Sequence, residues 1–259
     1  MPFKATMNAE CTWDDLRIGG FSLLQPKKGY RFSLDAPLLA ALVPLDGVDS
    51  VLDLGCGGGV LPLLLLGREP HLQVTGIEKQ EVPFALAEQN RKRNGVEMEL
   101  ILGDAMVSAE LLKGRIFDLI LSNPPYYAVG ACRLPQNEDI AAAKTEVYWN
   151  QKTMMEQAFS LLKENGRFGL IFDGRRGEEM ISLGIAAGFG LEKRIDVFTK
   201  AEHSEADRVY LQFYKGSLMT SECDSLVVYE QNGEMTPKMK RILEIYHGTG
   251  TVPCGDSHR

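Results

Sequence analysis

Two short stretches of this 259-residue chain carry residue types and spacings that could do chemistry. The first is a turn in which Gly55, Gly57 and Gly59 follow Asp53. Glycine lets the backbone turn sharply and approach a ligand without a Cβ in the way. A dinucleotide-binding turn would have its third glycine where this chain has Val60. The spacing instead fits a looser Asp-x-Gly-x-Gly-x-Gly turn.

Two carboxylates at the ends of the next apolar segments extend this pattern. Glu78 ends the first of them, where an acid can accept hydrogen bonds from both hydroxyls of a ribose. Asp104 follows the second, where it can accept a hydrogen bond from an adenine amino group or cap the helix after it. We expect their neighbours Lys79 and Ala105 to belong to the same site. Together these residues predict a nucleoside-containing ligand.

The second stretch is Asn123-Pro124-Pro125-Tyr126, directly after another apolar segment. Two prolines make a rigid exit from a strand, which is a sufficient structural explanation. A chemical role explains more of the residue types. The lone pair of an amino group on a base ring or carbonyl is delocalised, so hydrogen bonds from that NH₂ to the Asn123 side-chain oxygen and the Pro124 carbonyl would activate and aim the nitrogen. Tyr126 would stack on the flat target, as aromatic rings hold bases taken out of a helix.

The elements that must position these residues alternate along the chain from Ser50 onward. Apolar segments predict buried strands, and the stretches between them have helical periodicity. This alternation predicts an α/β fold of the Rossmann-like kind, a mostly parallel, doubly wound sheet with a terminal antiparallel hairpin. We expect strands over 50–54, 73–77, 98–102, 117–121 and 168–172, and the hairpin over 192–198 and 208–214. Residues 57–67 are expected to form a tight turn that leads into an apolar helix, and further helices are expected over 82–94 and 148–163.

The flanks divide the chain into three predicted parts. Residues 1–48 form an N-terminal segment with a loop over 25–32 and then a helix whose start is marked by Ser33 and Asp35. Asp35 could cap this helix or contact the ligand. Residues 49–216 form the main domain, and 217–259 an extension with a strand at 226–229, a helix at 237–246 and a flexible tail.

Composition excludes several classes of protein. The net charge of −7 disfavours a general nucleic-acid binder, although small basic clusters such as Arg91-Lys92-Arg93 interrupt the acidic background. Five scattered cysteines and four dispersed histidines predict reduced thiols and no metal site. No segment has the length of a membrane span or the pattern of a secretory signal, so we expect a cytoplasmic protein without a membrane partner.

The glycine turn combined with Asn123-Pro124-Pro125-Tyr126 resembles the class I S-adenosylmethionine-dependent amino-methyltransferases. Within that class the chain most resembles the bacterial tRNA(Val) adenine-N6-methyltransferase family. The stretch Gln25–Ala36 is similar to that family's N-terminal segment, which closes over the cofactor. Val227–Tyr229 and the helix ending in Arg241–Leu243 are similar to its C-terminal tail.

The resemblance implies S-adenosylmethionine as cofactor and the amino nitrogen of a tRNA adenine beside the anticodon as methyl acceptor. A release-factor glutamine or ribosomal RNA stays open as acceptor, and the protein is expected to be a monomer or homodimer. A donor-binding module without activity and a nicotinamide dehydrogenase are the alternatives from other classes. The implied catalytic residues are Asn123, Pro124, Pro125 and Tyr126. The implied cofactor-binding residues are Tyr30, Asp35, Asp53, Gly55, Gly57, Glu78, Lys79, Asp104, Ala105 and Asn123.

Asn123→Ala is expected to abolish methyl transfer while leaving donor binding nearly intact, because the proposed bonds of Asn123 reach the acceptor and not the donor. Turnover with radiolabelled donor, together with donor titration calorimetry, measures the two effects. Wild-type turnover in the variant would remove Asn123 from the mechanism.

Overall fold

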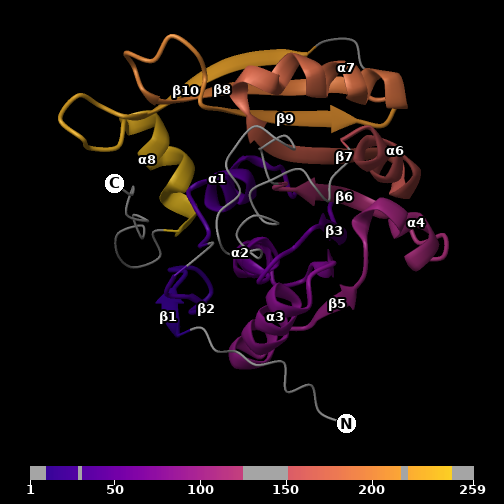
Figure 1. Ribbon diagram of the computed structural model, residues 1–259. Coiled ribbons are helices and arrows are strands. Elements are labelled where there is room, and N and C mark those ends of the chain that lie inside the picture. Colours follow the sequence, from indigo (N-terminus) through magenta and orange to yellow (C-terminus); the bar gives the residue numbers. More distant parts are fainter. Residues whose placement is uncertain (1–9, 29–30, 125–150, 217–220, 247–259) are drawn as a thin grey trace.

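The computed structural model describes residues 10–28, 31–124, 151–216 and 221–246. Its main feature is an eight-stranded sheet in the order β10-β8-β9-β7-β6-β3-β4-β5 (Figure 1). The strands are β3 (Ser50–Leu54), β4 (Gln73–Glu78), β5 (Met98–Leu102), β6 (Phe117–Ser122), β7 (Leu162–Asp173), β8 (Gly190–Lys200), β9 (Arg208–Tyr214) and β10 (Glu222–Tyr229).

Most of this sheet is parallel, which confirms the predicted fold class. β3 through β7 all run in one direction, whereas β9 is antiparallel to both β7 and β8. The predicted antiparallel hairpin is therefore β8–β9. It does not form the edge of the sheet, because β10 pairs with the outer side of β8 in parallel.

Helices pack on both faces of the sheet. One apolar cluster joins the sheet to α1 (Asp35–Leu42), α2 (Val60–Arg68) and α8 (Pro237–Leu243) with the 3₁₀ turn Glu244–Tyr246. The other joins it to α6 (Gln151–Leu161) and α7 (Gly177–Ala187), with the turn Ala105–Val107 and α4 (Ser108–Leu111) beside α6. The helix α3 (Glu81–Asn94) lies against β4 and β5.

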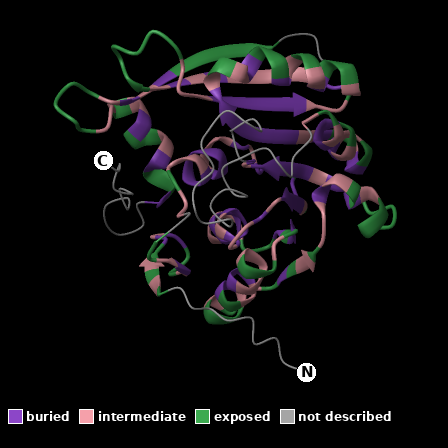
Figure 2. Cartoon of the chain, in the orientation of Figure 1, coloured by how far each residue is buried: buried purple, intermediate pink, exposed green. Residues whose placement is uncertain are grey.

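Alternation along the strands divides the apolar side chains between these two clusters. Val51 belongs to the cluster of α1 and α2, and Leu52 belongs to the cluster of α6 and α7. Tyr210 and Leu211 on β9 divide in the same way. Because successive side chains point to opposite faces, strands covered on both sides appear as continuous apolar segments. Figure 2 shows these middle strands as buried, while the first half of β10 is exposed.

The structure corrects the sequence prediction in three places. Residues 11–26 form a hairpin of β1 (Cys11–Asp15) and β2 (Ser22–Pro26), so the predicted loop over 25–32 begins within a strand. The helix predicted to reach residue 163 ends at Leu161, because Leu162 already pairs with Phe117 at the start of β7. The helix α7 was not predicted at all. Residues 148–150 and the tail lie outside the described residues.

Glycines explain why α7 was missed. Gly177 and Gly184 lie within it, and glycine disfavours helix by about 1 kcal/mol relative to alanine. A Cβ on Gly184 would lie 2.4 Å from the ring of Phe213, so the helix needs glycine there to approach the sheet. Close packing thus overrides local propensity.

Among the described residues no helix is both long enough and apolar enough to cross a membrane.

Asp118 fastens three strands together at the amino edge of the sheet. Its carboxylate accepts hydrogen bonds from the backbone and hydroxyl of Ser50 at 3.0 and 2.7 Å and from Lys163 Nζ at 2.8 Å. Partial burial raises the pKa of Asp118, but the bonds from Lys163 and Ser50 outweigh burial and lower it to about 2.

Asp118→Asn is expected to lower the free energy of unfolding at pH 7 by about 2 kcal/mol. Because the folded-state pKa lies below the ordinary value, the ionised carboxylate stabilises the fold above about pH 4, and this contribution is lost as the pH falls toward 2. Urea unfolding should therefore show the difference from wild type shrinking across that range. The exposed Asp46→Asn is the control, and an equal loss in both variants would contradict the assignment.

Candidate functional site

The glycine turn is fastened to the end of the neighbouring strand. The backbone N–H groups of Gly55 and Cys56 both donate to the carbonyl of Ile77 in β4, each at 2.9 Å. Gly55 and Gly57 have φ angles of 80° and 54°, which favour glycine because a Cβ is strained there. The predicted spacing of glycines thus corresponds to a backbone path that other residues would adopt at a cost.

Glu78 lies beneath this turn with its side chain buried. Its carboxylate accepts hydrogen bonds from the N–H of Gly57 at 2.9 Å and from the N–H of Gln80 at 2.7 Å. Burial raises the pKa of Glu78, and the backbone bonds offset only part of that effect. Each carboxylate oxygen keeps a lone pair beyond these bonds, so Glu78 can still accept from a ligand hydroxyl.

Asp53 is the second-last residue of β3, lies near Glu78 and is 2% exposed. Within the described part of the chain, no group donates a hydrogen bond to its carboxyl. Burial, and then the neighbouring charge of Glu78, raise the pKa of Asp53 to about 8. A buried carboxyl without a partner is costly, and a cationic ligand group beside it would favour its charged form. Asp53 therefore suits a positively charged group.

Asp104 and Lys79 meet at the ends of the next two strands. Lys79 Nζ donates to Asp104 at 2.7 Å, and Asp104 also accepts from the N–H of Met106 at 3.0 Å. Burial raises the pKa of Asp104, but these hydrogen bonds outweigh it and hold the pKa below its ordinary value. Asp104 caps the turn that begins at Ala105, which was one of the two roles predicted for it from the sequence. Its contact with an adenine stays a prediction.

The end of β6 is joined to the end of β3 by one buried hydrogen bond. The hydroxyl of Ser122 donates to the carbonyl of Leu54 at 2.9 Å, and both residues are fully buried. Asn123 and Pro124 come directly after Ser122, so they leave the sheet next to the glycine turn. Pro125 and Tyr126 lie outside the described residues.

Asp35 contacts β9 through Arg208. Asp35 is the first residue of α1 and accepts from Ser33 Oγ at 2.8 Å and from Arg208 Nε at 3.4 Å. It does not cap the helix, because the capping position is Leu34, which has no side-chain cap bond. Its contact with the cofactor stays a prediction, and Tyr30 lies outside the described residues.

One residue at this site was missed from the sequence. Asn90 on α3 is fully buried, accepts from the N–H of Leu24 at 2.6 Å and donates to the carbonyl of Gly58 at 2.8 Å. It therefore ties the N-terminal hairpin to the glycine turn. The available signal was a polar residue four positions after Leu86 on a buried helix face.

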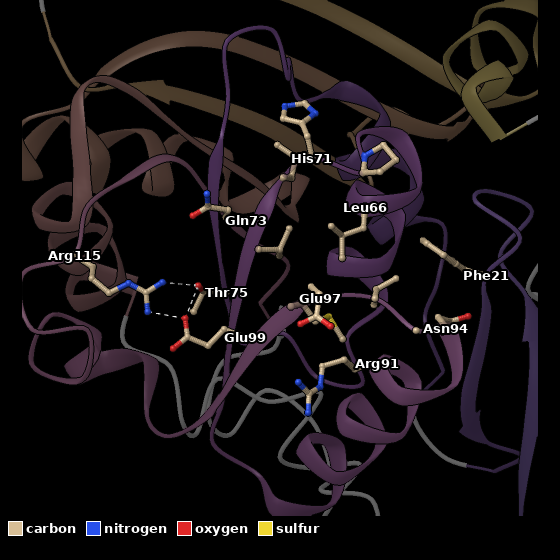
Figure 3. Close-up of a pocket in the computed structure, with 16 residues that line it drawn as sticks. Phe21, Leu66, His71, Gln73, Thr75, Arg91, Asn94, Glu97, Glu99 and Arg115 are labelled. Carbon is tan, nitrogen blue, oxygen red and sulfur yellow. Dashed lines mark hydrogen bonds and ion pairs between the residues drawn. The ribbon is translucent and has the colours of Figure 1, made fainter.

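The hollow in Figure 3, of about 860 Å³, lies elsewhere. Its lining includes Thr75, Glu99 and Arg115, which bond one another at the amino ends of β4 and β5. Glu78 and Asp104 lie at the opposite, carboxyl edge. The hollow is therefore separate from the candidate site. The evidence for the candidate site is the chemistry of its side chains and the order of the strands that carry them. In the described part of the chain, no group of three or more His, Cys, Asp or Glu residues could hold a metal ion.

Comparison with known proteins agrees with this geometry. Residues 34–191 match the family model described as the methyltransferase small domain. The chain belongs to the methyltransferase small domain family. Its methyl donor is S-adenosylmethionine, as the sequence predicted.

Curated relatives cover nearly the whole chain. A tRNA1(Val) (adenine(37)-N6)-methyltransferase of Proteus mirabilis is 27% identical over 237 residues, which is 87% of this chain and 92% of that one. The protein of the same name from Escherichia coli O9:H4 is 29% identical over 223 residues, covering 82% and 88%. A crystal structure described as a predicted O-methyltransferase from Agrobacterium tumefaciens has a TM-score of 0.64 at 19% identity, covering 82% of this chain and 96% of that one.

Asp53→Asn in this methyltransferase is expected to have opposite effects on stability and donor affinity. Because the folded-state pKa of Asp53 is raised, ionisation of the unfolded chain makes wild type lose stability as the pH rises from about 4 to about 8. The neutral asparagine removes that loss, so the variant should be more stable at pH 8 by about 1 kcal/mol or more. The same change should weaken donor binding, because it removes the negative charge.

Urea unfolding at pH 5, 6.5 and 8 and donor titration calorimetry measure these two effects. If the free energies of unfolding of variant and wild type changed in parallel with pH, ionisation of Asp53 would not be the cause of the stability loss in wild type.

Proposed function

We propose that this methyltransferase transfers a methyl group from S-adenosylmethionine to the amino nitrogen N6 of an adenine in tRNA. The observation that carries the proposal is the Ser122–Leu54 hydrogen bond, which sets Asn123 beside the glycine turn. The relatives from Proteus and Escherichia, both named for adenine methylation in tRNA1(Val), support the acceptor.

Strand order supports an extended donor along the carboxyl edge of the sheet. The neighbours β6, β3, β4 and β5 end, in that order, near Asn123, Asp53, Glu78 and Asp104. Adjacent strands are about 4.8 Å apart, so this row spans roughly 14 Å. That length suits an amino acid joined to a nucleoside, with its reactive sulfonium next to the acceptor.

Each group in the row suits a different part of the donor. Asp53 would pair with the ammonium of the amino-acid end, Glu78 would accept from the ribose hydroxyls, and Asp104 from the adenine amino group. Gly55 and Gly57 leave room for the backbone to approach the ligand. When bound, the donor supplies an electrophilic methyl group.

The acceptor nitrogen would be held by the residues after β6. The Asn123 side-chain oxygen and the Pro124 carbonyl accept hydrogen bonds from its NH₂ and direct its lone pair toward the donor. Tyr126 would stack on the base. No covalent intermediate is needed, so catalysis consists of positioning and electrostatic stabilisation.

The test is methyl transfer from radiolabelled donor to three acceptors assayed separately: total small RNA, ribosomal RNA and a release-factor preparation. We expect label in small RNA as N6-methyladenine, and none with Asn123→Ala. Label in the release factor alone would contradict the RNA acceptor and move the same chemistry to a glutamine amide.

A further inference from the structure

We propose that the outer side of the hairpin β1–β2 and the last turn of α3 form a second RNA-binding surface, where Trp13 stacks on an unpaired base. This inference rests on the proposed function, because it requires an RNA acceptor. It concerns a surface separate from the methyl-transfer site.

Trp13 is unusual because its large apolar side chain is 48% exposed. The guanidinium of Arg93 lies 5.5 Å from the centre of its ring. A cation–π contact at an exposed site contributes only about 0.5–1 kcal/mol, which is little reason to keep an indole in water. An aromatic ring beside a guanidinium is, however, the combination on which proteins stack unpaired bases.

The charge of this region is opposite to that of the whole chain. Residues 10–28, Arg31 and the helix α3 contain seven Lys and Arg residues and five Asp and Glu residues, whereas the chain carries −7. Lys27, Lys28, Lys92 and Arg93 are all exposed, and two of them pair with acids, Lys27 with Glu10 at 3.2 Å and Lys92 with Glu88 at 4.0 Å. An acidic protein with a locally positive surface around an exposed aromatic ring fits a polyanion with exposed bases.

The same charges disfavour a second copy of the chain as the occupant. Lysine and acidic residues are depleted at the centre of a stable protein interface, whereas Lys27, Lys28 and Lys92 are exposed in the same region as Trp13. A nucleic acid uses both features, because its bases stack on the ring and its phosphates pair with the cations.

Two asparagine side chains, the buried Asn90 and the partly buried Asn94, hold this surface in a fixed relation to the glycine turn. Asn94 donates to the carbonyl of Ser22 and accepts from its N–H, both at 2.8 Å. Asn90 makes the same pair of bonds with Leu24 and a third with the carbonyl of Gly58. RNA held by Trp13 is thereby held at a constant distance from the methyl donor.

The test compares Trp13→Ala and Trp13→Phe in the full chain, with Ile185→Ala as a matched control. Ile185 is 57% exposed on α7, at the far end of the molecule from the hairpin (Figure 1). We measure the Kd for a tRNA transcript by filter binding, the Kd for donor by calorimetry, and kcat at saturating tRNA. Thermal unfolding checks that all variants fold.

Trp13→Ala should raise the Kd for tRNA about 5- to 150-fold, the range for loss of one base–aromatic stack. Trp13→Phe should stay within about threefold of wild type, because it keeps a ring to stack on. Donor affinity and kcat should not change. An equal Kd in Trp13→Ala and Ile185→Ala overturns the proposal, and so does a dimer in sedimentation that Trp13→Ala dissociates.

A salt titration distinguishes contacts with RNA phosphates from base stacking on Trp13. Lys92→Gln should reduce the slope of log Kd against log salt by about 0.7–0.9, the value for one lost phosphate contact. Lys193→Gln, which removes a lysine paired with Glu222 on β10, should leave the slope unchanged. Equal slopes in both variants would contradict the proposal that RNA binds at this surface.

These binding measurements need no turnover, so failure of the two proposals can be distinguished. Transfer to tRNA with no effect of Trp13→Ala leaves the proposed function and rejects the surface. Tight tRNA binding that depends on Trp13, without transfer to any RNA, leaves the surface and rejects the acceptor.

Discussion

The donor side of the site depends on hydrogen bonds that the glycine turn makes with β4. The N–H groups of Gly55, Cys56 and Gly57 are taken by the carbonyl of Ile77 and the carboxylate of Glu78. Because the protein itself satisfies these groups, the turn has its shape before any ligand binds. A site formed in advance loses less conformational freedom on binding and holds its dipoles ready for the reaction. The bond from Ser122 to Leu54 extends this order to the strand that carries Asn123.

This arrangement puts two acids next to each other in a buried place. Burial raises the pKa of both Asp53 and Glu78, so the site works against the stability of the fold. The two apolar clusters on the faces of the sheet supply the stabilisation that makes this tolerable. Carboxyl groups with raised pKa values cluster at functional sites, so both acids fit a role in binding.

The core of the fold was predictable because its strands are buried on both faces. The predicted range 50–54 agrees with β3, and the range 98–102 agrees with β5, which lies at the edge of the sheet and is less buried. Glu78 ends β4 and Asp104 follows β5, as expected. The hairpin β1–β2 was not predicted, because Trp13 is exposed on it and polar residues interrupt its alternation. The role of Asn90 was hidden, since its partner Leu24 is 66 positions away in the chain. Long-range polar bonds leave no local pattern in a sequence.

The packing of α8 against α1 brings together segments from the two ends of the chain. The hydroxyl of Tyr246 donates to the carbonyl of Pro37 at 2.7 Å, across 209 positions. Leu38 and Leu39 share an apolar cluster with Met239 and Leu243. During synthesis, α1 leaves the ribosome long before the residues that cover it. The nascent chain therefore leaves the part of α1 that packs on α8 uncovered until α8 has been synthesised, and chaperone contact or premature association would concentrate there.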